Sequence, residues 1–227
     1  MSEEKKPLPR GVIIDFDFTA LDGAQILFDV AKQQLAVSGI DLTVKLEALH
    51  LVGNNYQGGL DELAQKLGVA LDAAATARDL AAAFNAALAE KVASAATPGF
   101  KAFVKALTDR GLKVVVASRA GAEALAPALE GLDPELVVPY SEQSPTYGNG
   151  KWDAWRRACN ANGLVNLLTV GVTGSGKGVK AVLWAGLSAL AVVHPHVAYQ
   201  DFGGADTVAE AFDAALADDV LRMLHLK

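Results

Sequence analysis

The chain has 227 residues, of which 52% are hydrophobic, and its 20 Lys and Arg against 26 Asp and Glu give a formal net charge of −6. This length fits one α/β domain with an insertion or two small domains, and the apolar content suffices for a sizeable core. A mildly acidic chain without a basic run argues against nucleic acid as a partner.

The sequence also predicts a cytoplasmic protein without a membrane partner. Residues 1–10 are polar and lack the apolar core of a signal peptide. The longest apolar run, residues 181–193, is too short to span a bilayer. Cys159 is the single cysteine, so no intramolecular disulfide can form and a reducing compartment is expected.

The first predicted strand, at about residues 11–16, ends in two carboxylates within Gly11-Val-Ile-Ile-Asp15-Phe-Asp17-Phe-Thr19. Chemistry in open α/β sheets takes place just past the carboxyl ends of the strands. Side chains two apart on a strand point the same way, so Asp15 and Asp17 are expected to share one crevice. Two carboxylates this close need a cation or a shared proton nearby. This stretch is the first candidate for an active site.

A long helical segment follows at residues 20–96, where apolar residues recur at helical spacing and Pro is absent. The insertion is too large for a simple crossover and is predicted to form a separate helical lid. The expected helices span about 22–38, 43–52, 58–67, 72–81 and 83–95.

The polar, glycine-rich stretch 53–59 interrupts these helices. It is either a helix–helix connector or a lid loop that contacts substrate through Asn54 and Tyr56, because loops that face a catalytic crevice often carry specificity.

Alternation of helices and strands resumes after Thr97-Pro98-Gly99 and predicts a Rossmann-like parallel α/β sheet. The second strand ends at Ser118 and Arg119, a polar loop leads to Lys151, and a glycine-rich loop (residues 173–178) opens a further helix. The expected strands span about 112–117, 136–139, 167–172 and 189–193. The expected helices span about 99–109, 121–130, 152–162, 179–185 and 206–223.

Strand-Asp-x-Asp-x-Thr, then strand-Ser, a loop Lys, and a strand with a glycine-rich loop, in this order, resemble the haloacid dehalogenase superfamily of hydrolases. The resemblance covers nearly the whole chain, and residues 97–118 are especially similar to its C1-capped, phosphoglycolate phosphatase-like group. It implies an α/β core domain at residues 1–19 and 97–227 and a helical cap domain at residues 20–96.

The resemblance also implies roles for individual residues. Asp15 would be the nucleophile that forms an aspartyl-phosphate, and Asp17 the general acid and base. Ser118 and Lys151 would hold the transferring phosphoryl oxygens. The expected substrate contacts are Thr19, which also supports the first turn, Arg119, Asn54, Tyr56 and Lys177.

Each motif also has an interpretation without catalysis. Asp15 and Asp17 could cap a turn between strand and helix, and Ser118 could be a helix N-cap. Lys151 could be an ordinary surface lysine, since Trp152 stands where the family usually has Pro after the lysine.

The fourth motif departs from the family pattern Gly-Asp-Ser-x-x-Asp. Alignment on Ala185-Gly186 places Gly174 and Gly178 at the two acidic positions, and no acidic residue occurs between residues 167 and 193. Mg²⁺ prefers octahedral oxygen ligation, normally by carboxylates and phosphate. A Mg²⁺ site on Asp15 and Asp17 is therefore possible but weakened.

Three explanations for this departure stay open. The protein has lost catalysis and kept a phosphate-shaped pocket, it works with weak metal affinity, or Lys177 supplies the missing positive charge. The same loop approaches a Walker phosphate loop, but Gly178 stands in place of the required Ser or Thr. His194 and His196 just beyond a strand are either metal ligands or loop residues.

The expected function is that of a haloacid dehalogenase-like hydrolase, a phosphatase acting on a small phosphorylated metabolite. Dehalogenation is a weaker expectation, because the second aspartate is a phosphatase feature. The alternative is a non-catalytic or metal-impaired protein of the same fold that binds a phosphate ligand and regulates.

Overall fold

The computed structural model describes residues 8–92, 98–141 and 151–226, without the side chains of Lys151 and Trp152. These residues form a six-stranded parallel sheet in the order β3-β2-β1-β4-β5-β6. The strands are β1 (Gly11–Asp15), β2 (Lys113–Ala117), β3 (Val137–Tyr140), β4 (Thr169–Thr173), β5 (Ser188–Val192) and β6 (Thr207–Ala209).

The strand order makes β1 the centre of the sheet. Ile13 of β1 pairs with Val115 of β2 on one side and with Gly171 of β4 on the other. The chain moves outward from β1 first through β2 and β3, and then in the opposite direction through β4, β5 and β6. In a doubly wound sheet, this reversal opens a crevice at the carboxyl ends of the two central strands.

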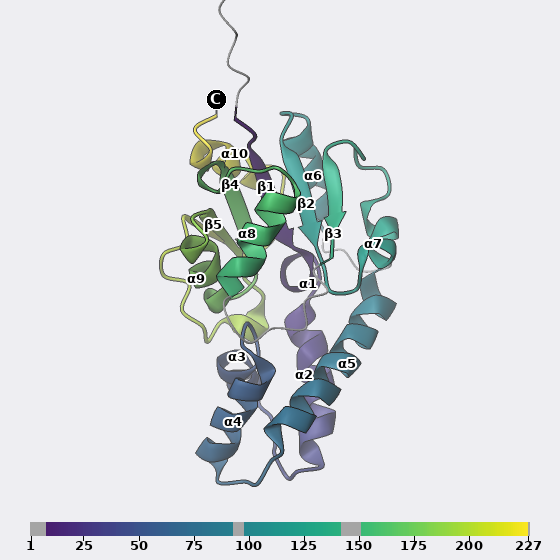
Figure 1. The fold of residues 1–227 in the computed structure, drawn as a ribbon, viewed down its shortest axis with the longest axis vertical. Coiled ribbons are helices and arrows are strands. Elements are labelled where there is room, and N and C mark those ends of the chain that lie inside the picture. The colour runs from purple at the N-terminus through teal and green to yellow at the C-terminus, as the bar shows by residue number, and fades with distance from the viewer. Residues whose placement is uncertain (1–7, 93–97, 142–150, 227) are drawn as a thin grey trace, which may run out of the picture.

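Helices cover both faces of the sheet (Figure 1). Val12 and Ile14 of β1 pack in one buried cluster, while Ile13 packs in a second cluster on the other face. This alternation is the period-two pattern of a strand that is buried on both sides. The core helices are α1 (Phe16–Thr19), α6 (Phe100–Thr108), α7 (Ala122–Leu129), α8 (Lys151–Ala161), α9 (Gly176–Trp184) and α10 (Leu216–Met223), and residues 166–168 and 195–197 form short 3₁₀ turns.

Four helices between β1 and β2 form a cap at the carboxyl end of the sheet (Figure 1). Phe84 of the cap packs against Phe18 of α1, with ring centroids 5.8 Å apart, so cap and core share one hydrophobic cluster. The predicted fold class, a Rossmann-like core with an inserted helical cap, is confirmed, while the cap boundaries at residues 20 and 96 stay a prediction. The cap helices are α2 (Gly23–Ala36), α3 (Val44–His50), α4 (Tyr56–Leu67) and α5 (Ala73–Val92).

Three of the predicted helices are wrong in extent. The segments expected at 72–81 and 83–95 form one helix, α5, in which Leu80, Phe84 and Leu88 are fully buried along one face. The terminal helix expected at 206–223 begins only at Leu216, because residues 207–209 pair with β5 as the edge strand β6.

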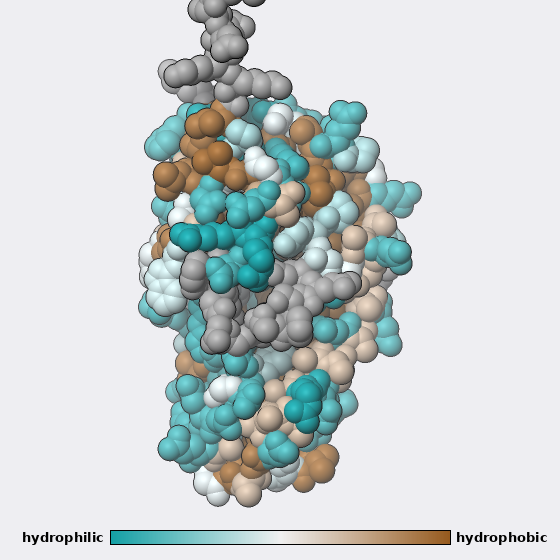
Figure 2. Space-filling model, in the orientation of Figure 1, coloured by the Kyte–Doolittle hydropathy of each residue, from teal (hydrophilic) through white to brown (hydrophobic). Residues whose placement is uncertain are grey.

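Hydrophilic and hydrophobic residues mix over the face of the molecule seen in Figure 2. Within the described residues, no helix has the length and apolar character needed to cross a membrane. The thiol of Cys159 is buried in the cluster between the sheet and α8 and α9.

Candidate active site

The turn after β1 presents the first two candidate residues at the carboxyl edge of the sheet. Asp15 is the last residue of β1, and the chain enters α1 at the next residue. The buried hydroxyl of Thr19 donates a 2.6 Å hydrogen bond to the Asp15 carbonyl, which closes this turn. Asp15 therefore lies on a rigid turn at the switch point of the sheet, with its side chain partly buried.

Asp17 is buried, and both of its carboxylate oxygens accept hydrogen bonds from the end of β2. Oδ1 accepts from Ser118 Oγ at 2.6 Å, and Oδ2 accepts from the Arg119 amide at 2.9 Å. Burial raises the pKa of Asp17, although the Arg119 charge and the two hydrogen bonds act in the opposite direction. The structure thus brings Asp17, Ser118 and Arg119 together beside Asp15.

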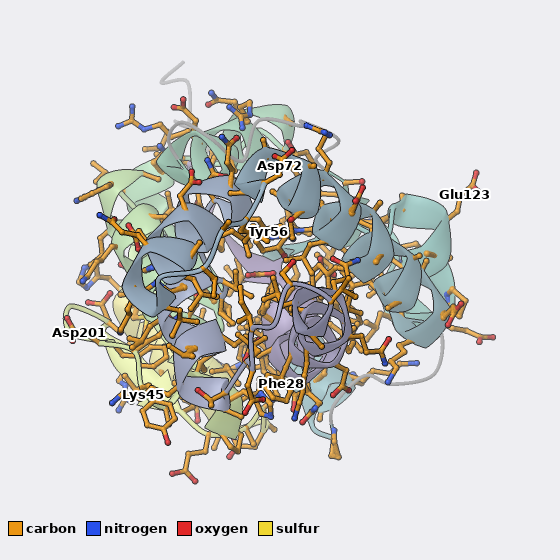
Figure 3. All side chains as sticks on the ribbon, turned by 90° about the horizontal axis from the view of Figure 1, so that it is seen from below. Phe28, Lys45, Tyr56, Asp72, Glu123 and Asp201 are labelled. Carbon is orange, nitrogen blue, oxygen red and sulfur yellow. The ribbon has the colours of Figure 1, made fainter. Side chains whose placement is uncertain are left out.

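Arg119 joins the core to the cap. Its Nη1 donates a 3.0 Å hydrogen bond to Tyr56 Oη, at the start of α4. Its guanidinium carbon lies 5.7 Å from the ring centre of Phe18, 5.9 Å from that of Tyr56 and 5.4 Å from that of Phe84. Such cation–π contacts hold a cation against an aromatic wall. Seen from the cap end in Figure 3, Tyr56 lies near the middle of the molecule, and Lys45, Glu123 and Asp201 lie toward the rim.

A cavity of about 150 Å³ opens at this point. Its polar lining comes from the ends of four neighbouring strands, β1 to β4, and the loops after them, and its apolar lining reaches along the sheet under α8. The polar residues are Asp15, Asp17, Ser118, Arg119, Tyr140, Thr173 and Ser175, and the others are Ile13, Phe18, Gly53, Ala117, Ala154, Trp155, Ala158, Gly178 and Ala181.

Two of the predicted substrate contacts have partners elsewhere. The Asn54 amide donates to the carbonyls of Leu49 and His50, at 3.2 and 2.7 Å, and so caps the end of α3. Lys177 Nζ also donates to the Leu49 carbonyl, at 3.0 Å. Neither residue is among those that line the cavity, so contact with substrate stays a prediction for both. Lys151 begins α8, and its side chain lies outside the described part of the chain.

The glycine-rich loop turns directly into α9. Ser175 is the N-cap, and its hydroxyl accepts a 3.0 Å hydrogen bond from the Gly178 amide. A Cβ atom at Gly174 would lie 1.9 Å from the Phe18 carbonyl oxygen, and one at Gly178 would lie 2.0 Å from Thr173 Oγ1. Both positions at which the resemblance expects acids therefore have no space for a side chain.

The residues present do not fit the Mg²⁺ site that the fold implies. Mg²⁺ is held by carboxylates at near-ideal octahedral geometry. Asp15 and Asp17 are the carboxylates among the described residues that line the cavity, and Asp17 is already hydrogen-bonded through both oxygens. Within residues 8–92, 98–141 and 151–226, no three His, Cys, Asp or Glu side chains form a group that could hold a metal ion.

The two histidines after β5 contact different parts of the molecule. His194 Nε2 lies 3.1 Å from the Thr19 carbonyl, whereas His196 Nδ1 lies 3.4 Å from Glu47 Oε2 in α3. The first thus supports the turn that carries Asp15, and the second contacts the cap. Glu47 and Gln200 stand in no recognisable motif, so the sequence did not point to them, although Gln200 bridges to the cap in the same region.

A parallel sheet of this order, with a helical cap inserted after its first strand, is the capped haloacid dehalogenase fold. Comparisons with models of protein families and with curated proteins give no match. Solved structures of this fold match nearly the whole chain. β-Phosphoglucomutase from Clostridium difficile has a TM-score of 0.73 at 13% identity, over 96% of this chain and 100% of the other.

Two further structures show the same likeness. CbbY from Rhodobacter sphaeroides in complex with phosphate has a TM-score of 0.67 at 18% identity, over 90% of this chain and 95% of the other. A HAD hydrolase, family IA, variant 3, from Entamoeba histolytica has a TM-score of 0.68 at 14% identity, over 95% and 99%. At these identities the likeness shows the fold.

Proposed function

We propose that the chain is a haloacid dehalogenase-like hydrolase that transfers a phosphoryl group from a small phosphorylated metabolite to Asp15. One observation carries the proposal: the Asp15 side chain lines a cavity at the switch point of the sheet together with Asp17 and Ser118. Structures of the same fold include CbbY with bound phosphate, which supports a phosphorylated ligand.

The roles of the two aspartates follow from their different environments. A carboxylate of Asp15 would attack phosphorus as the bond to the leaving oxygen breaks, giving an aspartyl-phosphate. Burial raises the pKa of Asp17, which favours a protonated carboxyl that can donate its proton to the leaving oxygen. The resulting Asp17 carboxylate would then take a proton from the water that hydrolyses the aspartyl-phosphate.

The walls of the cavity limit the substrate. A volume of about 150 Å³ resembles that of an engineered cavity that binds benzene, so the group inside must be small. Tyr56 and Phe84 of the cap and Arg119 of the core form one contact over this edge, which would exclude water during phosphoryl transfer.

A panel of small phosphomonoesters, assayed with and without Mg²⁺, tests the proposal. We expect turnover of at least one ester, and Asp15→Asn should lower it by about a hundredfold or more, because an amide cannot form the acyl-phosphate. Asp41→Asn, at an exposed position on the cap, is the matched control and should keep wild-type turnover. Turnover that survives in Asp15→Asn would contradict the proposal.

The crowding at Gly174 and Gly178 favours a second candidate, a non-catalytic protein that binds a phosphate ligand in the same cavity. Without a cation, the negative charges of Asp15 and a phosphoryl group repel each other. This repulsion opposes phosphoryl transfer to Asp15 more strongly than it opposes binding of a protonated or partly shielded phosphate ligand. Thermal stabilisation by a phosphorylated ligand, with no turnover across the panel, would support this candidate.

A further inference from the structure

We propose that the glycine-rich loop, residues 173–178, holds the cap to the core by direct hydrogen bonds and binds no divalent cation. In this chain the loop that the fold normally uses for a metal has become a docking site for the end of α3. The inference concerns this loop alone and does not require that the protein turns over a substrate.

Backbone packing closes the first acidic position. The Gly174 backbone lies so close to α1 that a Cβ atom would stand 1.9 Å from the Phe18 carbonyl oxygen and 3.0 Å from the Phe18 Cβ. A carbonyl oxygen is fixed to the backbone and cannot swing aside as a side chain can. A carboxylate at residue 174 would therefore require the turn that carries Asp15 and Asp17 to shift.

A side chain closes the second acidic position. Thr173, at the end of β4, is 1% exposed, and its hydroxyl has no hydrogen-bond partner among the described atoms. A Cβ atom at Gly178 would stand 2.0 Å from this hydroxyl and 2.9 Å from Ser175 Oγ. The two hydroxyls of the loop thus fill the space from which a carboxylate at residue 178 would start.

The polar groups of the loop turn toward the cap instead. Lys177 Nζ donates to the Leu49 carbonyl at 3.0 Å, in the last turn of α3. Carbonyls at a helix C-terminus have no partner within the helix and carry the negative end of its dipole, so a lysine ammonium is favourable there.

Gln200 makes the second link between loop and cap. Its Oε1 accepts a 2.7 Å hydrogen bond from the Gly176 amide at the start of α9. Its Nε2 donates to the carbonyls of Ala48 and Val52, at 2.5 and 3.0 Å. The Gln200 side chain therefore links the glycine-rich loop to the last turn of α3 and to the turn that follows α3.

Close contact between the Gly53 backbone of the cap and two side chains of the loop completes the docking site. Gly53 has φ of +72°, and a Cβ atom there would lie 2.8 Å from Ser175 Oγ and 3.2 Å from Lys177 Cβ. Only glycine fits such a left-handed position against a neighbouring segment. The cap turn and the loop are thus shaped for each other.

Calorimetric titration of the full chain with MgCl₂ and with MnCl₂, in the presence of inorganic phosphate, tests the cation half of the proposal. We expect no saturable binding of either cation at millimolar concentration. Saturable binding of either cation would overturn it, and this readout is independent of turnover.

Hydrogen exchange tests the cap half. Lys177→Ala should raise exchange of the amides at residues 48–54 by about tenfold or more, since one hydrogen bond from a charged group is worth at least that factor in an opening equilibrium. Lys180→Ala removes an exposed lysine from the same helix and should leave these amides unchanged. Unchanged exchange in Lys177→Ala, or an equal rise in both variants, would overturn the proposal.

Discussion

The Ser118 hydroxyl donates a 2.6 Å hydrogen bond to Asp17 Oδ1, although 101 residues separate the two in the chain. The bond joins the ends of β1 and β2 at the edge of the sheet where the cavity opens. The Ser118 oxygen also accepts a 3.0 Å hydrogen bond from the Ala120 amide. The geometry of the two strand ends therefore depends on the two acceptor oxygens of Asp17.

Asp17→Asn should lower both stability and turnover. An Asn side chain offers one oxygen, so its amide must face either Ser118 Oγ or the Arg119 amide and leave a buried donor unpaired. We expect a loss of about 1–3 kcal/mol in the free energy of unfolding. Urea denaturation measures it, with Asp41→Asn, at an exposed position on the cap, as the control that should keep both turnover and stability. Equal stability of the two variants would show that the Asp17 hydrogen bonds are unimportant.

Arg119→Lys should cost more stability than Tyr56→Phe. The tyrosine variant removes one hydrogen bond, worth about 1 kcal/mol, and keeps the ring against the guanidinium. The lysine variant also loses the flat contacts with Phe18, Tyr56 and Phe84, each a fraction of a kcal/mol or more. The free energies of unfolding of the two variants test this prediction. A larger loss in Tyr56→Phe than in Arg119→Lys would contradict a stabilising role of the aromatic contacts.

Glu47→Gln should stabilise the protein at alkaline pH. Burial, with help from Asp22 and Asp29 of the α2 region, raises the pKa of Glu47 from 4.5 to about 9. The folded state therefore keeps a proton that the unfolded state releases, so stability is full below about pH 4.5 and falls as the pH rises toward 9. His196, on the turn after β5, also faces Glu47, with its Nδ1 3.4 Å from Glu47 Oε2.

Thermal unfolding from about pH 5 to pH 9 checks this prediction. The wild-type melting temperature should fall across the range, and the Glu47→Gln curve should be flatter, with a gain of about 1–3 kcal/mol at pH 8. Glu90→Gln, at an exposed position on α5, should reproduce the wild-type slope. A wild-type slope in Glu47→Gln would refute the protonated state of Glu47.

Gly99→Ala should destabilise far more than Gly111→Ala. Both glycines have positive φ, +87° and +73°, so alanine strains the backbone by about 1–2 kcal/mol in each case. At Gly99 the new Cβ would also stand 1.9 Å from the Phe212 carbonyl oxygen, whereas nothing lies within 4 Å at Gly111. We expect a difference above about 2 kcal/mol in urea denaturation. Similar losses of stability in the two variants would show that the strain comes from the positive φ alone and not from the contact with Phe212.

Sequence patterns predicted the sheet because each central strand is a short apolar run that ends in a polar residue. Asp15 and Ser118 mark the ends of β1 and β2 within a residue or two of the structure. The edge of the sheet was misjudged, since the pairing of residues 207–209 with β5 depends on an open edge and not on local propensity. The break expected within α5 was also wrong, because the run of alanines there hides a continuous buried face.

Only the site residues that stand in recognisable motifs could be predicted from the sequence. Asp17, Ser118 and Arg119 stand in motifs, and the structure brings them together. The contacts of Lys177 and Gln200 are with backbone carbonyls of α3, and a sequence does not record which helix end lies opposite a given side chain. The assignment of Lys177 to substrate stays a prediction, and the structure adds a contact of Lys177 with the cap.

The Phe18 carbonyl beside Gly174 has a consequence for substitutions in the glycine-rich loop. An acid at residue 174 cannot be introduced alone, because the turn between β1 and α1 must first move away from the loop. An acid at residue 178 needs the Thr173 hydroxyl to move away at the same time. Replacing Gly174 and Gly178 alone therefore cannot give this chain a two-acid loop, because neighbouring segments must change as well.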